Sequence, residues 1–226
     1  MIDFYYNLSP NPTKIALALE EMGLAYTPHP VDTRKGEQFA ADYVAINPNG
    51  KVPAIVDDGV VVFDSNAILA YLSEKTGQFG PPAGAKGRAD FLSWLMFVAT
   101  GVGPFSGQCV HFRHFAPEDV PYAKARYTYE VERHFGILDA RLADRPYLLG
   151  ADYTVVDMSL WSWSRMVPFI LGEGGLDRFS NVKRHHDAVG ARPAVARALA
   201  LKDRHSFKPE MDDEARRHMF KFLKAA

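Results

Sequence analysis

The apolar positions at the start of the chain alternate between short strand-like runs and helical spacing. Residues 2–6 form an apolar, aromatic run that predicts a first strand, which a loop over residues 7–12 ends. In the helix predicted next, Lys14 falls off the apolar face and Gly23 suits the position after the last turn. That apolar face consists of Ile15, Ala18, Leu19 and Met22.

A second predicted strand, over residues 26–31, contains two prolines. Pro28 and Pro30 are two residues apart, so the backbone donors that they lack would face the same side. A strand with this defect belongs at the edge of a sheet, with its prolines turned outward. A second helix over residues 37–45 then leads to an Asn-Pro-Asn-Gly turn.

The segment from Lys51 to Tyr71 predicts a hairpin followed by a helix. An apolar run at 53–57 and a valine run at 60–63 favour strands, and the Asp-Gly step between them favours a tight turn. A helix opens at Asp64-Ser65, since an acidic or hydroxyl side chain there can cap it. The order of strand, helix, strand, helix, hairpin and helix predicts an α/β domain, a mixed four-stranded sheet with helices on both faces.

A segment rich in Gly and Pro then divides the chain. Residues 79–86 predict a linker between one domain over residues 1–78 and another over residues 87–226.

The second domain has an all-helical pattern. Apolar residues recur at helical spacing from Phe91 to Val98, and again from Tyr127 to Leu142 with charges between them. Residues 101–121, between these helices, are predicted to be irregular. The tail from His205 to Ala226 mixes basic and acidic residues and is expected to lie on the surface.

The clearest helix start of the chain lies at Thr154 and Asp157. The Thr154 side chain can accept from the Asp157 N–H while the Asp157 carboxylate reaches back, which predicts a buried folding element without chemistry. Two shorter helices are predicted over residues 181–189 and 193–201. The pair His185-His186 is interpreted as part of a solvated helix face.

Composition narrows the classes of function. The 226 residues are 47% hydrophobic and 23% charged, which is enough for a sizeable core. A net charge of −1 predicts no bulk attraction to nucleic acid or to an anionic membrane. A single cysteine excludes an internal disulfide framework. With neither a secretory signal nor a membrane span in the pattern, we expect a cytoplasmic protein.

Two features of the hairpin segment indicate a ligand. A proline that begins an interior strand is tolerable if the Val52-Pro53 bond is cis, which would aim the Val52 backbone at a guest. Asp64 and Ser65 at a helix N-terminus could hold the ammonium and carboxylate of an amino acid. A ligand that fits both features has a zwitterionic amino-acid group at one end and a peptide backbone that can pair with Val52. A small peptide such as glutathione has both.

The chain resembles the cytosolic glutathione transferases over nearly its whole length. The segments SPNPTKIALALEE, INPNGKVPAIVD, DSNAILAYLSEKTG, GPFSGQ and PYAKARYTYEVERHFGILDARL are most similar to the bacterial Nu class, whose members are glutathione-disulfide oxidoreductases with weak transferase activity. The resemblance implies the glutathione transferase fold, with a thioredoxin-like α/β N-terminal domain and an all-α C-terminal domain. It also implies a glutathione-dependent enzyme with glutathione, reduced or oxidised, as cosubstrate and no metal.

The resemblance assigns roles to nine residues. Ser9 and Asn11 would face the glutathione sulfur as catalytic residues, where donors at a helix start favour the thiolate over a thiol of pKa near 8.5. Arg133, on a helix of the second domain, would approach the bound peptide. The remaining residues would bind glutathione: Gln38 at the glycyl end, Lys51 at its carboxylate, Val52 with Pro53 at the cysteinyl unit, and Asp64 with Ser65 at the γ-glutamyl end.

Several of these residues have a plainer interpretation. Ser9 and Asn11 could be turn residues before a helix. Arg133 lies among acidic neighbours, so a surface ion pair is an equal alternative to a ligand contact. The spacing of Cys109, His111 and His114 could suit a metal, but three residues in an irregular loop make an incomplete set, and we assign no metal site.

Three kinds of function remain open at this stage. The leading one is a transferase-like enzyme that reduces disulfides with glutathione sulfur, because no cysteine stands in the first loop; the same thiolate could attack a small electrophile. The alternatives are a non-catalytic glutathione-binding or regulatory module and a purely structural protein. The resemblance also implies a homodimer, for which we expect exposed aromatic residues around Phe91 and Trp94.

Overall fold

The computed structural model describes residues 1–221 and separates into two compact units. The first comprises Met1–Tyr71 and the segment that begins at Ala196, and the second is Leu72–Val195. These units divide the chain at other points than the predicted domain boundaries at residues 78 and 87, which stay a prediction. Part of the predicted surface tail, residues 222–226, lies outside the described residues.

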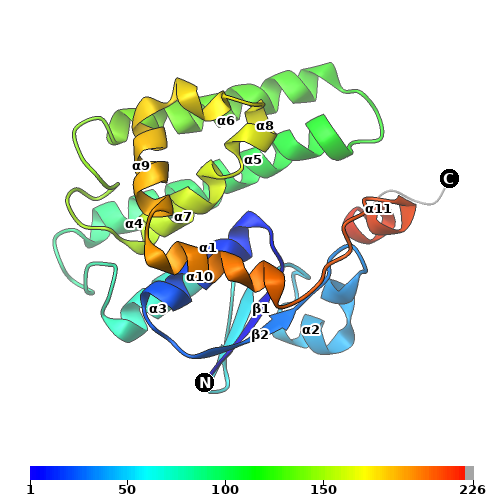
Figure 1. Ribbon diagram of the computed structural model, residues 1–226, viewed down its shortest axis with the longest axis horizontal. Coiled ribbons are helices and arrows are strands. Elements are labelled where there is room, and N and C mark those ends of the chain that lie inside the picture. Colours follow the sequence, from blue (N-terminus) through cyan, green and yellow to red (C-terminus); the bar gives the residue numbers. More distant parts are fainter. Residues whose placement is uncertain (222–226) are drawn as a thin grey trace. The chain divides into compact units, whose positions relative to one another are not determined.

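The first unit contains the predicted mixed four-stranded sheet, and this fold class is confirmed. The strand order is β2-β1-β3-β4, with β1 parallel to β2 and the other pairs antiparallel. Figure 1 shows α1 and α3 on one side of the strands and α2 on the other. The elements are β1 (Ile2–Tyr6), α1 (Pro10–Glu21), β2 (Tyr26–Pro30), η1 (Glu37–Phe39), α2 (Ala41–Ile46), β3 (Ala54–Asp57), β4 (Val60–Phe63) and α3 (Ser65–Thr76).

The prolines of β2 explain its place in the sheet. β2 is an edge strand, as predicted, and Pro28 lies opposite Phe4 in the register. Phe4, in the neighbouring β1, also pairs with Ile55 of β3 and is fully buried. The edge position leaves one side of β2 without a neighbour, so missing donors there disturb no ladder.

Helix α1 is buried almost all round, which corrects one prediction. Lys14 was expected to lie off the apolar face, but its side chain is only 1% exposed. An uninterrupted run of α1 residues, from Pro12 to Leu19, is buried. A helix covered on several sides buries even the positions that an amphipathic pattern assigns to solvent.

The second unit is helical, and the helices from residue 88 to 115 follow one another directly. They are α4 (Arg88–Phe97), η2 (Val98–Val102), α5 (Gly103–Val110) and η3 (His111–Phe115), of which η2 and η3 are π-helical. Further along lie α6 (Pro121–Arg141), α7 (Val155–Ser164), α8 (Val167–Leu171), η4 (Gly175–Arg178) and α9 (Ser180–Gly190). Then α10 (Pro193–Leu199) leads from this unit into the first one, where η5 (Ala200–Asp203) and α11 (Asp213–Met219) follow.

The prediction of irregular structure over residues 101–121 is therefore wrong for most of that segment. Two of its glycines allow close helix packing: a Cβ on Gly101 would lie 2.4 Å from His134 Nε2, and one on Gly103 would lie 3.3 Å from Trp163 Nε1. Pro104 is tolerated because it stands in the first turn of α5.

The capping box at the start of α7 is confirmed, and its Asp157 has further partners in Leu148 N, at 2.8 Å, and in His185. Asp157 is fully buried and accepts from Thr154 N at 2.8 Å. His185 Nε2 lies 3.0 Å from Asp157 Oδ1, and His185 is 0% exposed. The interpretation of His185 as a solvated residue is therefore wrong, since a buried carboxylate needs such partners.

The expectation of an exposed Phe91 is also wrong. Phe91 is fully buried in the second unit, where the Arg88 guanidinium lies 4.9 Å from the centre of its ring. The exposed apolar side chains of α4 are instead Leu92 and Met96. No helix within residues 1–221 combines the length and the apolar character needed to cross a membrane.

Candidate functional site

The first unit contains a cavity of about 800 Å³. Five of the nine predicted site residues line it, and they come from three separate segments. They are Ser9 and Asn11 at the start of α1, Gln38 in η1, and Lys51 and Val52 before β3. The fold thus brings together residues up to 43 positions apart in sequence, from Ser9 to Val52.

Ser9 is the N-cap residue of α1, yet its hydroxyl does not cap the helix. Its main chain is fixed instead, because Asn7 Oδ1 accepts from Ser9 N at 2.9 Å and Ser9 O accepts from Thr13 Oγ1 at 2.9 Å. Within the described chain, neither the Ser9 hydroxyl nor the Asn11 side chain has a hydrogen-bond partner. A held backbone with free polar side chains is an arrangement that can serve a ligand.

Two prolines shape the free donors at this helix start. Pro10 and Pro12 stand in the first turn of α1 and have no N–H group. Asn11 lies between them and retains its N–H, while Thr13 N already donates to Ser9 O at 3.2 Å. The positive end of the helix therefore offers the Asn11 amide beside the Ser9 hydroxyl.

The Val52-Pro53 peptide bond is cis, as predicted. The segment before it is held by Tyr43, whose hydroxyl donates to Lys51 O at 2.5 Å, and by Asn47, whose Nδ2 donates to Lys51 O at 2.6 Å. Burial raises the pKa of Tyr43 to about 12, so this hydroxyl keeps its proton and stays a donor. Val52 itself makes no main-chain hydrogen bond with the described residues and lines the cavity.

Gln38 is buried, at 4% exposure, and its amide is only half used. Its Nε2 donates to Thr33 O at 3.2 Å and to His218 O at 3.5 Å. Its Oε1 is buried and accepts no hydrogen bond from the described part of the chain. A buried acceptor without a partner costs about 1–3 kcal/mol, which a donor on a ligand would recover.

Asp64 and Ser65 stand at the start of α3 but are not among the described residues that line the cavity. Asp64 Oδ1 accepts from Asn66 N at 2.9 Å and from Ala67 N at 3.1 Å, so one oxygen caps the helix. Asp64 has φ +70°, a left-handed conformation that Asp tolerates better than most residues. Its other oxygen has no hydrogen-bond partner within residues 1–221.

A buried cation influences the same region. Burial lowers the pKa of Lys14 to about 7, and the attraction of Asp64 opposes that change. The Asp64 carboxylate is therefore an acceptor at the surface that also favours the protonated form of Lys14 in α1.

Arg133 lies in the second unit and forms an ion pair with Glu130, one turn earlier in α6. Its Nε donates to Glu130 Oε2 at 2.9 Å, and this bond holds the pKa of Glu130 below its usual value. Its other predicted role, a contact with the ligand, stays a prediction. The ion pair is the alternative that the sequence had left open.

The tail supplies residues of the cavity that the sequence did not indicate. His205, Phe207 and Lys208 line it, although the tail was expected simply to lie on the surface. Lys208 N donates to Asp32 Oδ2 at 2.7 Å, and Arg34 Nη1 donates to Lys208 O at 2.9 Å. The tail lacks a periodic apolar pattern, so nothing in its sequence predicts these contacts. Its course from α10 to α11 can be followed in Figure 1.

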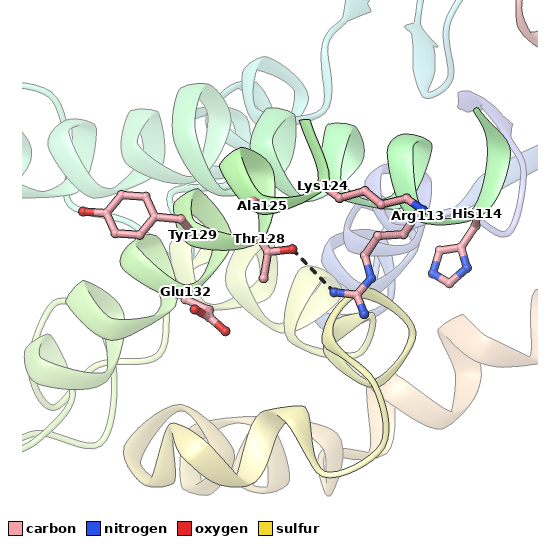
Figure 2. A pocket seen from close by; sticks show the side chains of 7 residues that line it. All are labelled: Arg113, His114, Lys124, Ala125, Thr128, Tyr129 and Glu132. Carbon is pink, nitrogen blue, oxygen red and sulfur yellow. Dashed lines mark hydrogen bonds between the residues drawn. The ribbon is translucent and has the colours of Figure 1, made fainter. Parts of the chain in front are cut away.

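A second hollow, of about 570 Å³, lies in the second unit and has a polar lining. Figure 2 shows the Arg113 side chain reaching toward Thr128, to which its Nη1 donates at 3.5 Å. Lys124 and Glu132, also in the lining, form ion pairs with Asp119 at 2.5 Å and with Arg178 at 2.8 Å. None of the predicted site residues lines this hollow, and we assign it no role in the site.

Possible metal ligands do not gather in the described residues, where no three His, Cys, Asp or Glu side chains could hold an ion. Cys109 is buried in α5, with its Sγ 3.7 Å from Thr128 Oγ1. His114 stacks on Phe169 with ring centres 4.2 Å apart.

Comparison with known proteins gives two family-model matches. The glutathione S-transferase N-terminal domain matches residues 8–75, and the glutathione S-transferase C-terminal domain matches residues 111–201. The chain is 41% identical over 206 residues to the disulfide-bond oxidoreductase YfcG of Escherichia coli, covering 88% of this chain and 94% of that protein. It is 36% identical over 208 residues to the disulfide-bond oxidoreductase YghU of Escherichia coli, covering 84% and 70%.

Solved structures give the same result. A glutathione transferase from Burkholderia graminis, with two glutathione molecules bound per subunit, matches with a TM-score of 0.84 and 37% identity, covering 90% of this chain and 89% of that one. A glutathione transferase from Pseudomonas putida, with one glutathione disulfide bound per subunit, matches with a TM-score of 0.82 and 33% identity, covering 88% and 90%.

Proposed function

Because the chain belongs to the glutathione S-transferase family, as its sequence predicted, we propose that it is a glutathione-dependent enzyme that reduces disulfides. In this proposal the cavity of the first unit binds glutathione, and the bound sulfur attacks the disulfide of a second substrate. Two relatives are named disulfide-bond oxidoreductases, and two similar structures contain bound glutathione or glutathione disulfide. Both findings support the proposal.

The observation that carries the proposal is a set of free polar groups on one cavity. The Ser9 hydroxyl, the Asn11 side chain and the Val52 main chain have no hydrogen-bond partners among residues 1–221. All three residues line the same cavity. The main chain of Val52 would pair with the cysteinyl unit, which places the sulfur near Ser9 and Asn11. Gln38 would accept from the glycyl part through its unused Oε1.

The two charged ends of glutathione have matching groups in this account. Lys51, which is exposed in the lining, would meet the glycyl carboxylate. The free oxygen of Asp64 would meet the γ-glutamyl ammonium, and the start of α3 at Ser65 would meet the carboxylate beside it.

The thiolate is the reactive form, and the site offers means to stabilise it. A thiol with pKa near 8.5 is mostly protonated at pH 7, and each unit of lowering requires about 1.4 kcal/mol. A hydrogen bond to a charged group supplies about 1.5–3 kcal/mol. Ser9 and Asn11 together would therefore suffice to ionise the bound thiol.

The described lining of this cavity contains no thiol of the protein. Its single cysteine, Cys109, is 0% exposed and lies in α5 of the second unit. Reduction of a disulfide would then use two glutathione sulfurs, which leave as glutathione disulfide.

Two assays separate the proposal from its alternatives. We expect glutathione-dependent reduction of 2-hydroxyethyl disulfide to exceed conjugation of chlorodinitrobenzene. The reverse order would identify a transferase acting on small electrophiles. Glutathione binding with activity in neither assay would identify a non-catalytic binding or regulatory module.

Gln38 provides a test of the binding mode. Replacing it by leucine removes the unused acceptor, and one neutral hydrogen bond is worth about 1 kcal/mol. We expect Gln38→Leu to raise the Kd for glutathione about fivefold, measured by calorimetry. Gln108→Leu, at an exposed position of α5, is the matched control with unchanged Kd. An unchanged Kd in Gln38→Leu would remove this residue from the site.

We also propose that the protein is a homodimer that covers the free edge of its sheet. β4 is an edge strand with two exposed apolar side chains on one face, Val61 at 45% and Phe63 at 43%. An exposed apolar edge of this kind favours pairing with another chain. We expect Val61→Lys to sediment as a 25 kDa monomer and the control Val44→Lys, on α2, to remain a dimer. Equal sedimentation of the two variants would contradict this interface.

A further inference from the structure

His205 is a histidine of the tail that lines the same cavity as Ser9 and Asn11. Its side chain is half-buried, and its Nδ1 lies 2.9 Å from the hydroxyl oxygen of Tyr6. The two rings meet edge to face, with centres 6.0 Å apart. One nitrogen of the imidazole is thereby fixed by the last residue of β1.

Tyr6 determines which nitrogen carries the fixed proton. Its side chain is 1% exposed, and its hydroxyl donates to Leu201 O at 3.3 Å. Burial raises the pKa of Tyr6, so the hydroxyl keeps its single proton. When that proton points to Leu201 O, His205 donates from Nδ1 to the Tyr6 oxygen at 2.9 Å; this tautomer leaves Nε2 able to accept a proton and is the one that the proposal uses.

The Nε2 atom has no hydrogen-bond partner within the described residues. The charged groups around His205 are mostly cationic: Lys202 and Lys208 line the same cavity, and Arg204 is adjacent in sequence. Among the described lining residues the acidic one is Asp32, which already accepts from Lys208 N and Arg34 N. The free nitrogen is thus available to a thiol bound in the same cavity.

We propose that His205 is the proton carrier of the disulfide exchange, accepting a proton from the glutathione thiol and passing it to the departing substrate thiolate. This inference rests on the proposed function. Tyr6 is then a positioning residue, because it holds the imidazole through Nδ1 and does not meet the substrate.

The protons and electrons balance over one cycle. The first glutathione thiol gives its proton to Nε2, and the thiolate attacks one disulfide sulfur. A mixed disulfide forms, the second substrate sulfur leaves as a thiolate, and Nε2 protonates it. A second glutathione repeats the proton transfer and attacks the glutathione sulfur of the mixed disulfide. Two glutathiones have then become glutathione disulfide, two substrate thiols have formed, and the imidazole is neutral again.

The test uses two disulfides with different leaving groups. A thiolate of high pKa leaves slowly without a proton, whereas a thiolate of low pKa needs little help. We expect His205→Gln to lower kcat about tenfold with 2-hydroxyethyl disulfide and less than twofold with 5,5′-dithiobis(2-nitrobenzoate), after subtraction of the uncatalysed rates. Tyr6→Phe should show the same selectivity with a smaller loss, about threefold against no change.

His29→Gln is the matched control, since His29 pairs with Asp3 on the sheet and is not part of the described lining. It should keep both rates within twofold. Calorimetry with reduced glutathione should give the same Kd for His205→Gln as for the unmodified protein, which shows that the site is intact. A loss that is equal for the two substrates, or no loss, would overturn the role of His205 alone. An unmodified protein that binds glutathione but reduces neither disulfide would overturn the proposed function and this inference with it.

Discussion

The Ser9→Ala variant will turn over 2-hydroxyethyl disulfide about 30-fold more slowly than the unmodified protein, while its Kd for glutathione changes less than threefold. The Ser9 hydroxyl makes no hydrogen bond in the described structure, so its removal disturbs no internal contact. The substitution removes the hydrogen bond that the Ser9 hydroxyl would donate to the thiolate. A hydrogen bond to a charged acceptor is worth about 2 kcal/mol. Such a bond exists only with the ionised sulfur, so the loss belongs to kcat.

Ser9→Thr is the matched control for this prediction, because it retains the hydroxyl at the N-cap position. Its kcat should stay within about threefold of the unmodified value. Steady-state kinetics at saturating glutathione measure kcat, and calorimetry measures the Kd. If Ser9→Ala lowered affinity and turnover by the same factor, Ser9 would be a binding residue and its assigned role would be wrong.

The Asp64→Asn variant will bind glutathione about 30-fold more weakly. Asn keeps an oxygen to cap Asn66 N and Ala67 N, and it tolerates the φ of +70° that residue 64 adopts. Only the negative charge is lost, and with it a charge-assisted bond to the γ-glutamyl ammonium, worth about 2 kcal/mol. The kcat at saturating glutathione should change less than threefold.

Asp64→Ala separates the charge from the fold. It also removes the cap, and alanine is less tolerant of a positive φ, so we expect an additional loss of about 2 kcal/mol in the free energy of unfolding. Denaturant unfolding measures this term. If Asp64→Asn bound glutathione normally while Asp64→Ala bound it weakly, Asp64 would act on helix α3 and not on the ligand.

The parts of the fold that the sequence predicted well are those that local sequence patterns determine. The apolar runs of the strands, the Asp-Gly turn and the prolines of β2 each act within a few residues, and the sheet contains the predicted strands. The capping box at Thr154 is of the same kind. Short-range rules of this type need no knowledge of the tertiary contacts.

The wrong predictions concern positions whose environment is set from far away in the chain. Lys14 and His185 are polar residues in helices, and burial by other elements decides their state. Gly101 resembles a helix breaker in the sequence, but the close approach of His134 in α6 explains it. Local propensity cannot reveal such contacts.

The residues of the candidate site also form two groups: those that a sequence motif reveals and those that only the tertiary structure reveals. Ser9, Asn11 and Val52 stand in motifs of the family and lie on one cavity, so a sequence resemblance could find them. His205 and Lys208 line that cavity in a tail that Asp32 and Arg34 hold through the Lys208 main chain and that Tyr6 contacts at His205. Main-chain contacts leave little signature in the side-chain pattern, which is why the tail looked like plain surface.

Disulfide reduction by this protein depends on a bound tripeptide, and on no cysteine of the protein, for the reacting sulfur. Calorimetric titration of the whole protein with reduced and with oxidised glutathione tests this most directly. The account predicts saturable heat with at least one of the two forms, strongly weakened in Asp64→Asn and unchanged in Cys109→Ala. An absence of heat with both forms would contradict the account.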